Sequence, residues 1–185
     1  MSFEVRSDQP SPHSLAHRLA RLCWSIINQT AFRLIPKPFH GLRRALLCLF
    51  GAKIAKGAYV HSSVIVWAPW NLHMAKGSCL GPRVNCYNVD TIILDEYVTV
   101  SQGAHLCAAS HDFTIPEFPL ITAPIHLCKG VWIATEAFIA MGITVGENAV
   151  IGARSVVIHD MPPGMVCAGH PCKPIKERLA KLKAR

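Results

Sequence analysis

Residues 133–158 read IATEAFIAMGITVGENAVIGARSVVI, and a branched aliphatic residue stands at every sixth position. The residue that follows it is Ala or Gly in four of five cases. Neither the helical spacing of three and four nor simple alternation explains this period. A period of six predicts a β-solenoid, in which each hexapeptide makes one short strand and one corner. The aliphatic positions are Ile133, Ile139, Val145, Ile151 and Val157.

The same register extends toward the N-terminus. We expect its aliphatic residues to point into a three-sided coil, with the small residue at the crowded corner and coils stacked about 4.8 Å apart. A parallel sheet with poor helices is the alternative, but it does not explain one fixed period. Five coils result, whose remaining inward positions are Ile54, Val60, Val66, Met74, Leu80, Cys86, Leu94, Val100, Leu106 and Leu127.

The repeat is interrupted once by a long excursion. The step from Leu106 to Leu127 is 21 residues, 15 more than the repeat itself. The inserted stretch contains His111 and is rich in aromatic residues and prolines. A long loop in a compact array is usually functional, and its apolar residues predict that it packs against another surface.

Charge and cysteine content limit the class of protein. The net charge is +8, and basic residues dominate 1–56 and 171–185 while residues 57–170 are mildly acidic. Such ends suit a phosphate-bearing cofactor, a membrane surface or nucleic acid; no basic motif interleaved with aromatics supports nucleic acid. The eight cysteines form no C-x-x-C pair, which predicts free thiols in a reducing compartment. With no signal peptide evident, we expect a cytoplasmic protein.

The flanks divide the chain into three predicted segments. Residues 1–53 form a helical cap, residues 54–170 the β-helix with a loop at 107–126, and residues 171–185 a basic helix opened by Pro174. Within 13–35, helical spacing relates Leu15, Leu19, Leu22, Ile26 and Ile27. This stripe is expected either to cover the open first coil or to lie on a membrane surface, and the two roles are compatible.

Several motifs resemble a known family. Residues 130–176 contain a W-I-A step, the segment IGARSVV and the ending PPGMVCAGHPCKPIK. These resemble the hexapeptide-repeat acyltransferases, over residues 40–178. The stretches SHDFTIPEFPLITAPI and RRALLCLFGAKI are most similar to colanic acid biosynthesis acetyltransferases, relatives of the maltose, galactoside and nodulation O-acetyltransferases. The resemblance implies a left-handed parallel β-helix that assembles as a homotrimer, with active sites between subunits and the loop of one reaching the next.

The chemistry that the resemblance implies is acetyl transfer from acetyl-CoA to a sugar hydroxyl, such as that of a lipid-linked exopolysaccharide unit. A hydroxyl is a poor nucleophile near neutral pH, so a general base must take its proton. Imidazole suits this role, and His111 matches the catalytic histidine of the family. Asp112 or a backbone carbonyl would hold its tautomer.

Other residues are matched to binding roles by the same resemblance, and no metal is expected. Main-chain groups of Thr135 and Ala153 would meet the pantetheine arm. Trp132 would pack on the histidine or on that arm, or else simply on the wall of the prism. The expected contacts to the CoA phosphates come from Arg154, Lys173, Lys176 and Arg178, and the expected contacts to the acceptor from Tyr87, Asn88 and Asp112.

Two other functions compete. A γ-class carbonic anhydrase shares this fold and binds zinc through three histidines, for which His73, His105, His111 and His126 are candidates. Zinc needs ligands within about 2.1 Å, and the H-x₄-H spacing of that class is missing, since His111 is the sixth residue after His105. A non-catalytic scaffold is the second alternative.

Overall fold

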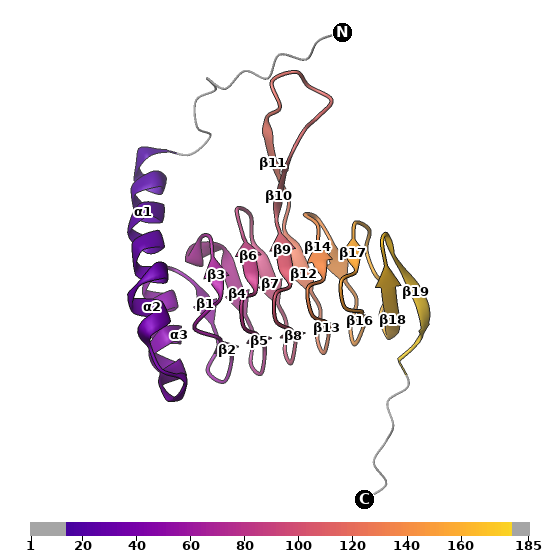
Figure 1. Cartoon of the computed structure of the whole chain (residues 1–185), viewed down its shortest axis with the longest axis horizontal. Coiled ribbons are helices and arrows are strands. Elements are labelled where there is room, and N and C mark those ends of the chain that lie inside the picture. Colours follow the sequence, from indigo (N-terminus) through magenta and orange to yellow (C-terminus); the bar gives the residue numbers. More distant parts are fainter. Residues whose placement is uncertain (1–13, 179–185) are drawn as a thin grey trace, which may run out of the picture.

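Three parallel sheets form the sides of a prism that is closed at one end by helices (Figure 1). The computed structural model of the chain describes residues 14–178. The chain passes repeatedly from side A to side B to side C, and the edges between them are here called A–B, B–C and C–A. Side A contains β1 (Lys53–Ile54), β4 (Leu72–Met74), β7 (Ile92–Leu94), β12 (Ile125–Leu127) and β15 (Thr144–Val145).

Side B is the longest sheet, because two further strands extend it beyond the fifth coil. It contains β2 (Tyr59–Val60), β5 (Cys79–Leu80), β8 (Thr99–Val100), β13 (Trp132–Ile133), β16 (Val150–Ile151), β18 (Met165–Gly169) and β19 (Cys172–Glu177). Side C contains β3 (Ile65–Val66), β6 (Asn85–Tyr87), β9 (His105–Cys107), β14 (Phe138–Ile139) and β17 (Val156–Val157).

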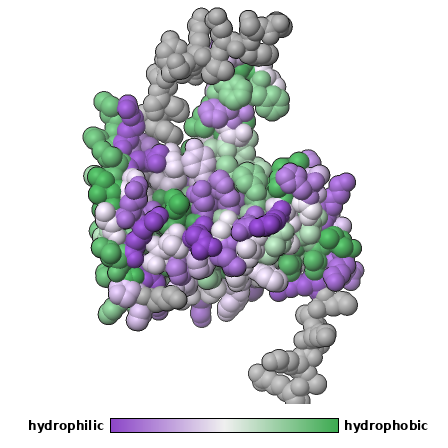
Figure 2. All heavy atoms as spheres, viewed as in Figure 1, coloured by the Kyte–Doolittle hydropathy of each residue, from purple (hydrophilic) through white to green (hydrophobic). Residues whose placement is uncertain are grey.

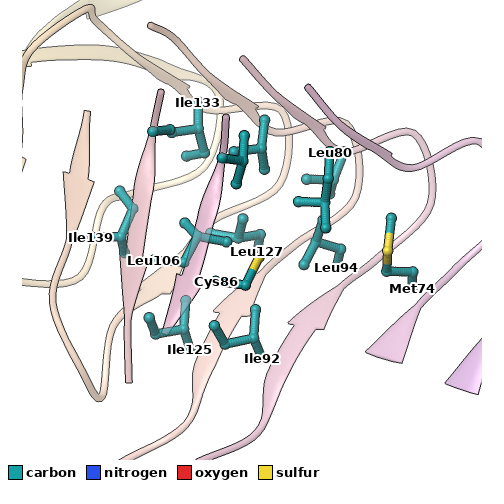
Figure 3. Close-up of a cluster of buried hydrophobic side chains, with 14 of the residues drawn as sticks. Met74, Leu80, Cys86, Ile92, Leu94, Leu106, Ile125, Leu127, Ile133 and Ile139 are labelled. Atoms are coloured by element: carbon teal, nitrogen blue, oxygen red, sulfur yellow. The ribbon is translucent and has the colours of Figure 1, made fainter. Parts of the chain in front are cut away.

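The sequence period is confirmed as the period of the core. All fifteen predicted inward side chains are at most 6% exposed, and they stack in rows along the prism axis (Figure 3). The small residues that follow them stand where space is tight: a Cβ on Gly146 would lie 2.5 Å from the backbone nitrogen of Pro163. Five full coils therefore stack as predicted, and Met161 and β18 begin a sixth.

The A–B corners use left-handed backbone conformations. Gly57, Gly77 and Gly130 have φ between 69° and 85°, and Tyr97 and Asn148 take the same conformation at their coils. Glycine adopts this region without steric cost. At Gly130 a Cβ would also collide with the end of the Asn148 side chain, which would have to move.

The helical cap covers the first coil. It consists of α1 (Leu15–Gln29), α2 (Ala31–Leu34), the 3₁₀ turn η1 (Lys37–Phe39) and α3 (His40–Leu49), and a second turn, η2 (Pro69–Asn71), lies within the coil. The single helix expected over 13–35 is interrupted at Thr30. Trp24, Phe32 and Leu47 are at most 1% exposed and continue the core into the cap.

Polar side chains of the cap donate hydrogen bonds to the unpaired carbonyl groups at the open end of the prism. N–H groups of the first coil donate to the second coil, as from His61 N to Leu80 O at 3.0 Å, so carbonyls that face the other way lack a strand partner. Each side of the prism receives a donor from a helix. Arg44 donates to Ile54 O on β1 at 3.1 Å, Arg43 to Val60 O on β2 at 3.0 Å, and Trp24 to Val66 O on β3 at 2.7 Å.

The expected C-terminal helix is wrong for residues 172–177. This segment is strand β19, which pairs antiparallel with β18 and so completes side B. The pairing satisfies backbone groups at the last open edge, and this tertiary context outweighs the helical propensity of the sequence. Residues 1–13 and 179–185, which belong to the predicted cap and helix, lie outside the described residues.

All eight cysteines are free thiols. Burial raises the pKa of the Cys86 thiol to about 12, which makes this core residue unreactive. No helix within residues 14–178 has the length and the apolar run needed to cross a bilayer.

Candidate active site

The long excursion is a two-stranded arm. β10 (Ala109–His111) pairs antiparallel with β11 (Leu120–Thr122), and together they project from the C–A edge after the third coil (Figure 1). The base of the arm is tied to the prism, since Thr122 Oγ1 donates to Asp90 Oδ2 at 3.1 Å. The tip is exposed in the single chain, where Phe113 is 75% accessible.

His111 lies at the end of β10 with its ring held in a fixed orientation. Its Nδ1 is 2.7 Å from the carbonyl oxygen of Phe118, and its ring stacks on the Phe118 ring with centroids 5.6 Å apart. A carbonyl only accepts hydrogen bonds, so Nδ1 carries the hydrogen and Nε2 presents a lone pair. Phe118 reaches this position through a left-handed backbone conformation with φ of 53°, which is unusual for an aromatic residue. In the neutral form of the ring, this geometry leaves Nε2 as the hydrogen-bond acceptor.

Asp112 has a different task from the orienting role considered for it. Its Oδ1 accepts from Thr114 Oγ1 at 2.6 Å and from Thr114 N at 2.9 Å. These bonds, the side-chain one first, hold the pKa of the Asp112 carboxyl below its usual range. Of the two groups expected to set the His111 tautomer, the backbone carbonyl of Phe118 makes the hydrogen bond. Nothing in the sequence marks a backbone acceptor of this kind.

Two predicted acceptor residues, Tyr87 at the end of β6 and Asn88 directly after it, lie at the C–A edge and differ in exposure. Asn88 is fully buried, and its Oδ1 accepts from Trp67 N at 2.9 Å and Ala68 N at 3.1 Å while its Nδ2 donates to Ala68 O. The prediction that Asn88 touches the acceptor is therefore wrong, because the buried amide joins two coils. Tyr87 is half-buried, and its ring packs edge-on with the Trp67 ring, with the centroids 6.0 Å apart.

A groove runs beside this edge between α1 and side C. Its volume is about 310 Å³, and its walls include Arg21, Asn28, Arg33 and Trp67. The Arg21 guanidinium lies 3.5 Å above the centre of the Trp67 ring, a cation–π geometry. Beyond this groove, Trp67 contacts Tyr87, and Tyr87 pairs with Cys107 at the base of the arm.

Thr135 and Ala153 lie one above the other on a different edge, B–C. The N–H of Arg154 donates to Thr135 O at 2.9 Å, which fixes this stacking. Neither Thr135 N nor Ala153 N has a hydrogen-bond partner within residues 14–178. The edge therefore presents two parallel backbone donors about one coil apart. Arg154 itself is paired with Glu136, Nε to Oε2 at 2.7 Å.

Trp132 stands on the outer face of side B. Its Nε1 donates to Ser101 Oγ on the preceding coil at 2.9 Å, and the residue is 45% exposed. In one chain it is thus a wall residue with a free face.

The predicted phosphate-binding cluster is only partly assembled. Lys173 is the second residue of β19 and pairs with Ala168 near the B–C edge, and Lys176 lies further along the same strand. Arg178 is at the far end of that strand, where its Nη1 donates to Gly130 O at 2.9 Å and Asn148 O at 3.0 Å. This places Arg178 on the A–B edge, where it holds the C-terminal segment against two corners.

His111 and the edge formed by Thr135 and Ala153 do not meet in one chain. His111 extends from the C–A edge, whereas Thr135 and Ala153 line the B–C edge, and the whole width of side C separates them. A site that uses both groups is incomplete without a second copy.

The histidines considered for zinc do not form a group. His73, His105, His111 and His126 lie on β4, β9, β10 and β12. Within the described part of the chain, three potential ligands gather only at Asp95, His126 and Cys128, whose donor atoms all lie within 4.8 Å of one another. His126 Nε2 is hydrogen-bonded to Asp95 Oδ2 at 2.9 Å. This trio, which sequence reasoning missed, lies on side A across from the arm.

Comparisons with known proteins agree with the geometry. No family model matches the chain. It is 36% identical over 156 residues to "Putative colanic acid biosynthesis acetyltransferase WcaF" of Escherichia coli K12, covering 84% of this chain and 86% of that protein. It is 30% identical over 138 residues to galactoside O-acetyltransferase of the same organism, covering 73% and 68%.

A solved structure shows the same fold. A hexapeptide-repeat-containing acetyltransferase of Vibrio cholerae O1 biovar eltor, complexed with acetyl coenzyme A, superposes with a TM-score of 0.80 at 19% identity, covering 95% of this chain and 96% of that one. The hexapeptide period, the arm and the extent of the sequence identity lead to one conclusion: the chain belongs to the hexapeptide-repeat acetyltransferases.

Proposed function

We propose that this acetyltransferase moves an acetyl group from acetyl-CoA to a sugar hydroxyl, with His111 as general base, in exopolysaccharide biosynthesis. The observation that carries the proposal is the His111 geometry, in which the Phe118 carbonyl fixes the tautomer and leaves Nε2 exposed. The donor is suggested by the acetyl-CoA complex of the Vibrio cholerae protein. The acceptor and pathway are suggested by the names of the Escherichia coli relatives.

The reaction then proceeds in two proton transfers. Nε2 takes the proton of the acceptor hydroxyl as its oxygen attacks the thioester carbonyl carbon, which forms a C–O bond and a tetrahedral oxyanion. The C–S bond breaks next, and the imidazolium returns the proton to the departing thiolate. The products are an acetyl ester and free CoA. The Phe118 carbonyl stabilises the imidazolium through the same hydrogen bond that sets the tautomer.

The B–C edge is the proposed donor site. The unpaired N–H groups of Thr135 and Ala153 can bond to the amides of the pantetheine arm, and the small side chain of Ala153 leaves room for close approach. Lys173 and Lys176 on the adjacent β19 supply positive charge for the CoA phosphates. Arg154 can join them if it exchanges Glu136 for phosphate, and Trp132 can pack against the chain of the donor with its free face.

The acceptor side is the groove between α1 and side C. Trp67 and Tyr87 offer aromatic faces for a sugar ring, and Arg21 and Asn28 offer polar groups at the wall. With Asn88 buried, Tyr87 is the remaining acceptor residue from the sequence prediction on this edge, while Asp112 shapes the arm.

A homotrimer provides the missing half of the site. Because His111 and the donor corner lie on different edges of one prism, the arm of one subunit would place Nε2 over the Thr135 and Ala153 edge of its neighbour. Closed cyclic symmetry repeats this arrangement three times with one type of contact. The exposed arm residues Phe113 and Ile115 would be covered there.

The acceptor is proposed to be a lipid-linked sugar, acetylated in the cytoplasm at the inner face of the membrane. The basic helical cap and the groove beneath α1 lie at the same end of the prism. An acceptor held in a membrane would therefore enter next to the surface that touches the membrane.

Mixed assemblies test the shared site. His111→Ala removes the base, and Ala153→Trp blocks the donor corner, so each variant alone should release CoA at a rate near background. In a one-to-one mixture, roughly a quarter of the intersubunit sites should combine an intact arm with an intact corner, which restores about that fraction of wild-type turnover. A mixture as inactive as its parents would place the whole site in one chain and overturn the proposal.

A panel of sugars and glycolipids in the same thiol-release assay identifies the acceptor class. His159→Ala is the matched control, since His159 is an exposed histidine after β17 of the fifth coil, two coils beyond the one from which the arm leaves. It should leave turnover unchanged, whereas background turnover with every sugar tested would exclude sugar acetylation.

A further inference from the structure

Helix α1 is mounted with its apolar face outward. Leu15, Leu19, Leu22 and Ile26 follow the spacing of one helical stripe and are 74%, 64%, 58% and 56% exposed. A surface helix of a globular protein normally turns such a stripe toward the core. Sequence reasoning expected this stripe either to cover the first coil or to lie on a membrane, and the structure turns it away from the coil.

The stripe that faces the prism has the same spacing, two residues later. Its members are His17, Arg21, Trp24 and Asn28. Trp24 and Asn28 are at most 4% exposed, and His17 packs against Trp67 and Trp70 at 5.7 and 5.2 Å between centroids. Trp24 also donates a hydrogen bond to Val66 O of the first coil. These contacts and this bond fix the rotation of α1, and they would be lost if the leucine stripe turned inward.

The outward apolar surface continues beyond α1. Leu34 and Leu49 are each 80% exposed, Phe39 is 59% and Leu42 is 58%. Several of these residues line a shallow apolar depression of about 350 Å³ next to Pro36. Figure 2 shows hydrophobic atoms concentrated along the end of the molecule formed by α1–α3. An exposed apolar surface of this extent marks an interaction site.

The charge of the same segment indicates the partner. Residues 14–56 contain eight Lys and Arg and no Asp or Glu. Arg18 and Arg33 are exposed beside the apolar stripe. A surface that combines leucines, one phenylalanine and uncompensated positive charge matches a bilayer interface with anionic headgroups. It does not match a second copy of itself, because two such caps would bring like charges together.

We infer that the outer face of the cap, defined by Leu15, Leu19, Leu22, Ile26, Leu34, Phe39, Leu42 and Leu49, is a docking surface for anionic lipid bilayers. The inference rests on the proposed function in one respect only: docking would bring the enzyme to the lipid-linked acceptor proposed above. The helices lie in the interface, and their leucines enter the headgroup–acyl boundary. In a cyclic trimer the three caps have equal height along the symmetry axis, so all three meet one bilayer together and strengthen binding by multivalency.

Co-sedimentation with vesicles tests this surface without any enzymatic readout. Full-length protein should pellet with vesicles of phosphatidylglycerol and phosphatidylcholine and remain in the supernatant with phosphatidylcholine alone. The double variant Leu19→Gln, Leu22→Gln should bind at least about tenfold more weakly. Arg18→Gln with Arg33→Gln should weaken binding by about fivefold for each charge removed.

Ile158→Gln is the matched control, because Ile158 is 47% exposed but lies beyond β17, far from the cap. It should bind vesicles as the wild type does. Wild-type protein that fails to pellet with anionic vesicles overturns the inference, as does equal binding by the leucine variant. If the surface instead joins two copies, sedimentation without lipid would give a larger mass for the wild type than for the leucine variant. Acetyl transfer to a water-soluble sugar should persist in the leucine variant, so the two proposals fail separately.

Discussion

The prism and the arm obey different rules. In the prism, a side chain in one coil has nearly the same surroundings as the side chain at the equivalent position of the next coil. All fifteen inward residues are buried. In the arm, two short strands and one backbone hydrogen bond to His111 determine the geometry, and most side chains beyond β10 are exposed. The prism supplies stability through redundant burial, whereas the arm holds the proposed base through a few specific contacts. Mutations should therefore separate the two properties.

The largest expected effect is on catalysis, in the arm. His111→Ala removes the proposed base, and turnover in a CoA-release assay should fall by about 10²–10⁴-fold. The thermal midpoint should stay within about 1 °C of wild type, because the His111 side chain is exposed and its loss leaves no core cavity. Unchanged turnover would remove His111 from the mechanism.

The second effect is on stability, in the prism. Ile133→Ala empties a fully buried position in the fourth coil, so the free energy of unfolding in urea should fall by about 2–5 kcal/mol. Phe113→Ala, at an exposed arm residue, should change the unfolding of the isolated chain by no more than about 0.5 kcal/mol. Similar losses at the two positions would contradict the division between prism and arm.

A third, smaller effect concerns the cap. Arg43 is fully buried and donates to carbonyls of Val60, Ile35 and Pro36 at 2.9–3.0 Å. Arg43→Met leaves these acceptors unpaired and should reduce the free energy of unfolding by roughly 2 kcal/mol. Hydrogen exchange should show the loss first in α3 and β1–β3, with the later coils still protected. Uniform loss of protection would mean that cap and prism unfold as one unit.

The smallest effect is a pH dependence. Burial lowers the pKa of His105, whose Nε2 lacks a hydrogen-bond partner in the described structure. As the pH falls, His105 therefore takes up a proton in the unfolded chain at a higher pH than in the folded chain. The stability that neutral His105 allows is complete above about pH 6.5 and is lost as the pH falls through the folded pKa. His105→Phe should make the fall in thermal midpoint between pH 7.5 and 5 shallower. A slope identical to wild type would show that His105 is not responsible.

The sequence was sufficient for the prism and insufficient for what is attached to it. The core positions follow from one period, so Ile133 or Leu106 could be assigned by counting. The arm could be located at its interruption of that period, but its hairpin pairing and the Phe118 carbonyl have no periodic signal. Asn88 was misassigned because an amide that joins two coils and an amide that touches a sugar look alike in sequence. The segment from Cys172 to Glu177 became a strand because β18 offered an unpaired edge.

Stacked coils also set fixed distances between features along the axis of the prism. The groove by α1 lies at the first coils, the arm leaves after the third, and the donor corner spans the fourth and fifth. Each coil inserted or deleted between them would shift one substrate against the other by about 4.8 Å, more than the separation of about 3–3.5 Å at which acyl transfer takes place. Gain or loss of a whole repeat would thus change which acceptors the enzyme can reach.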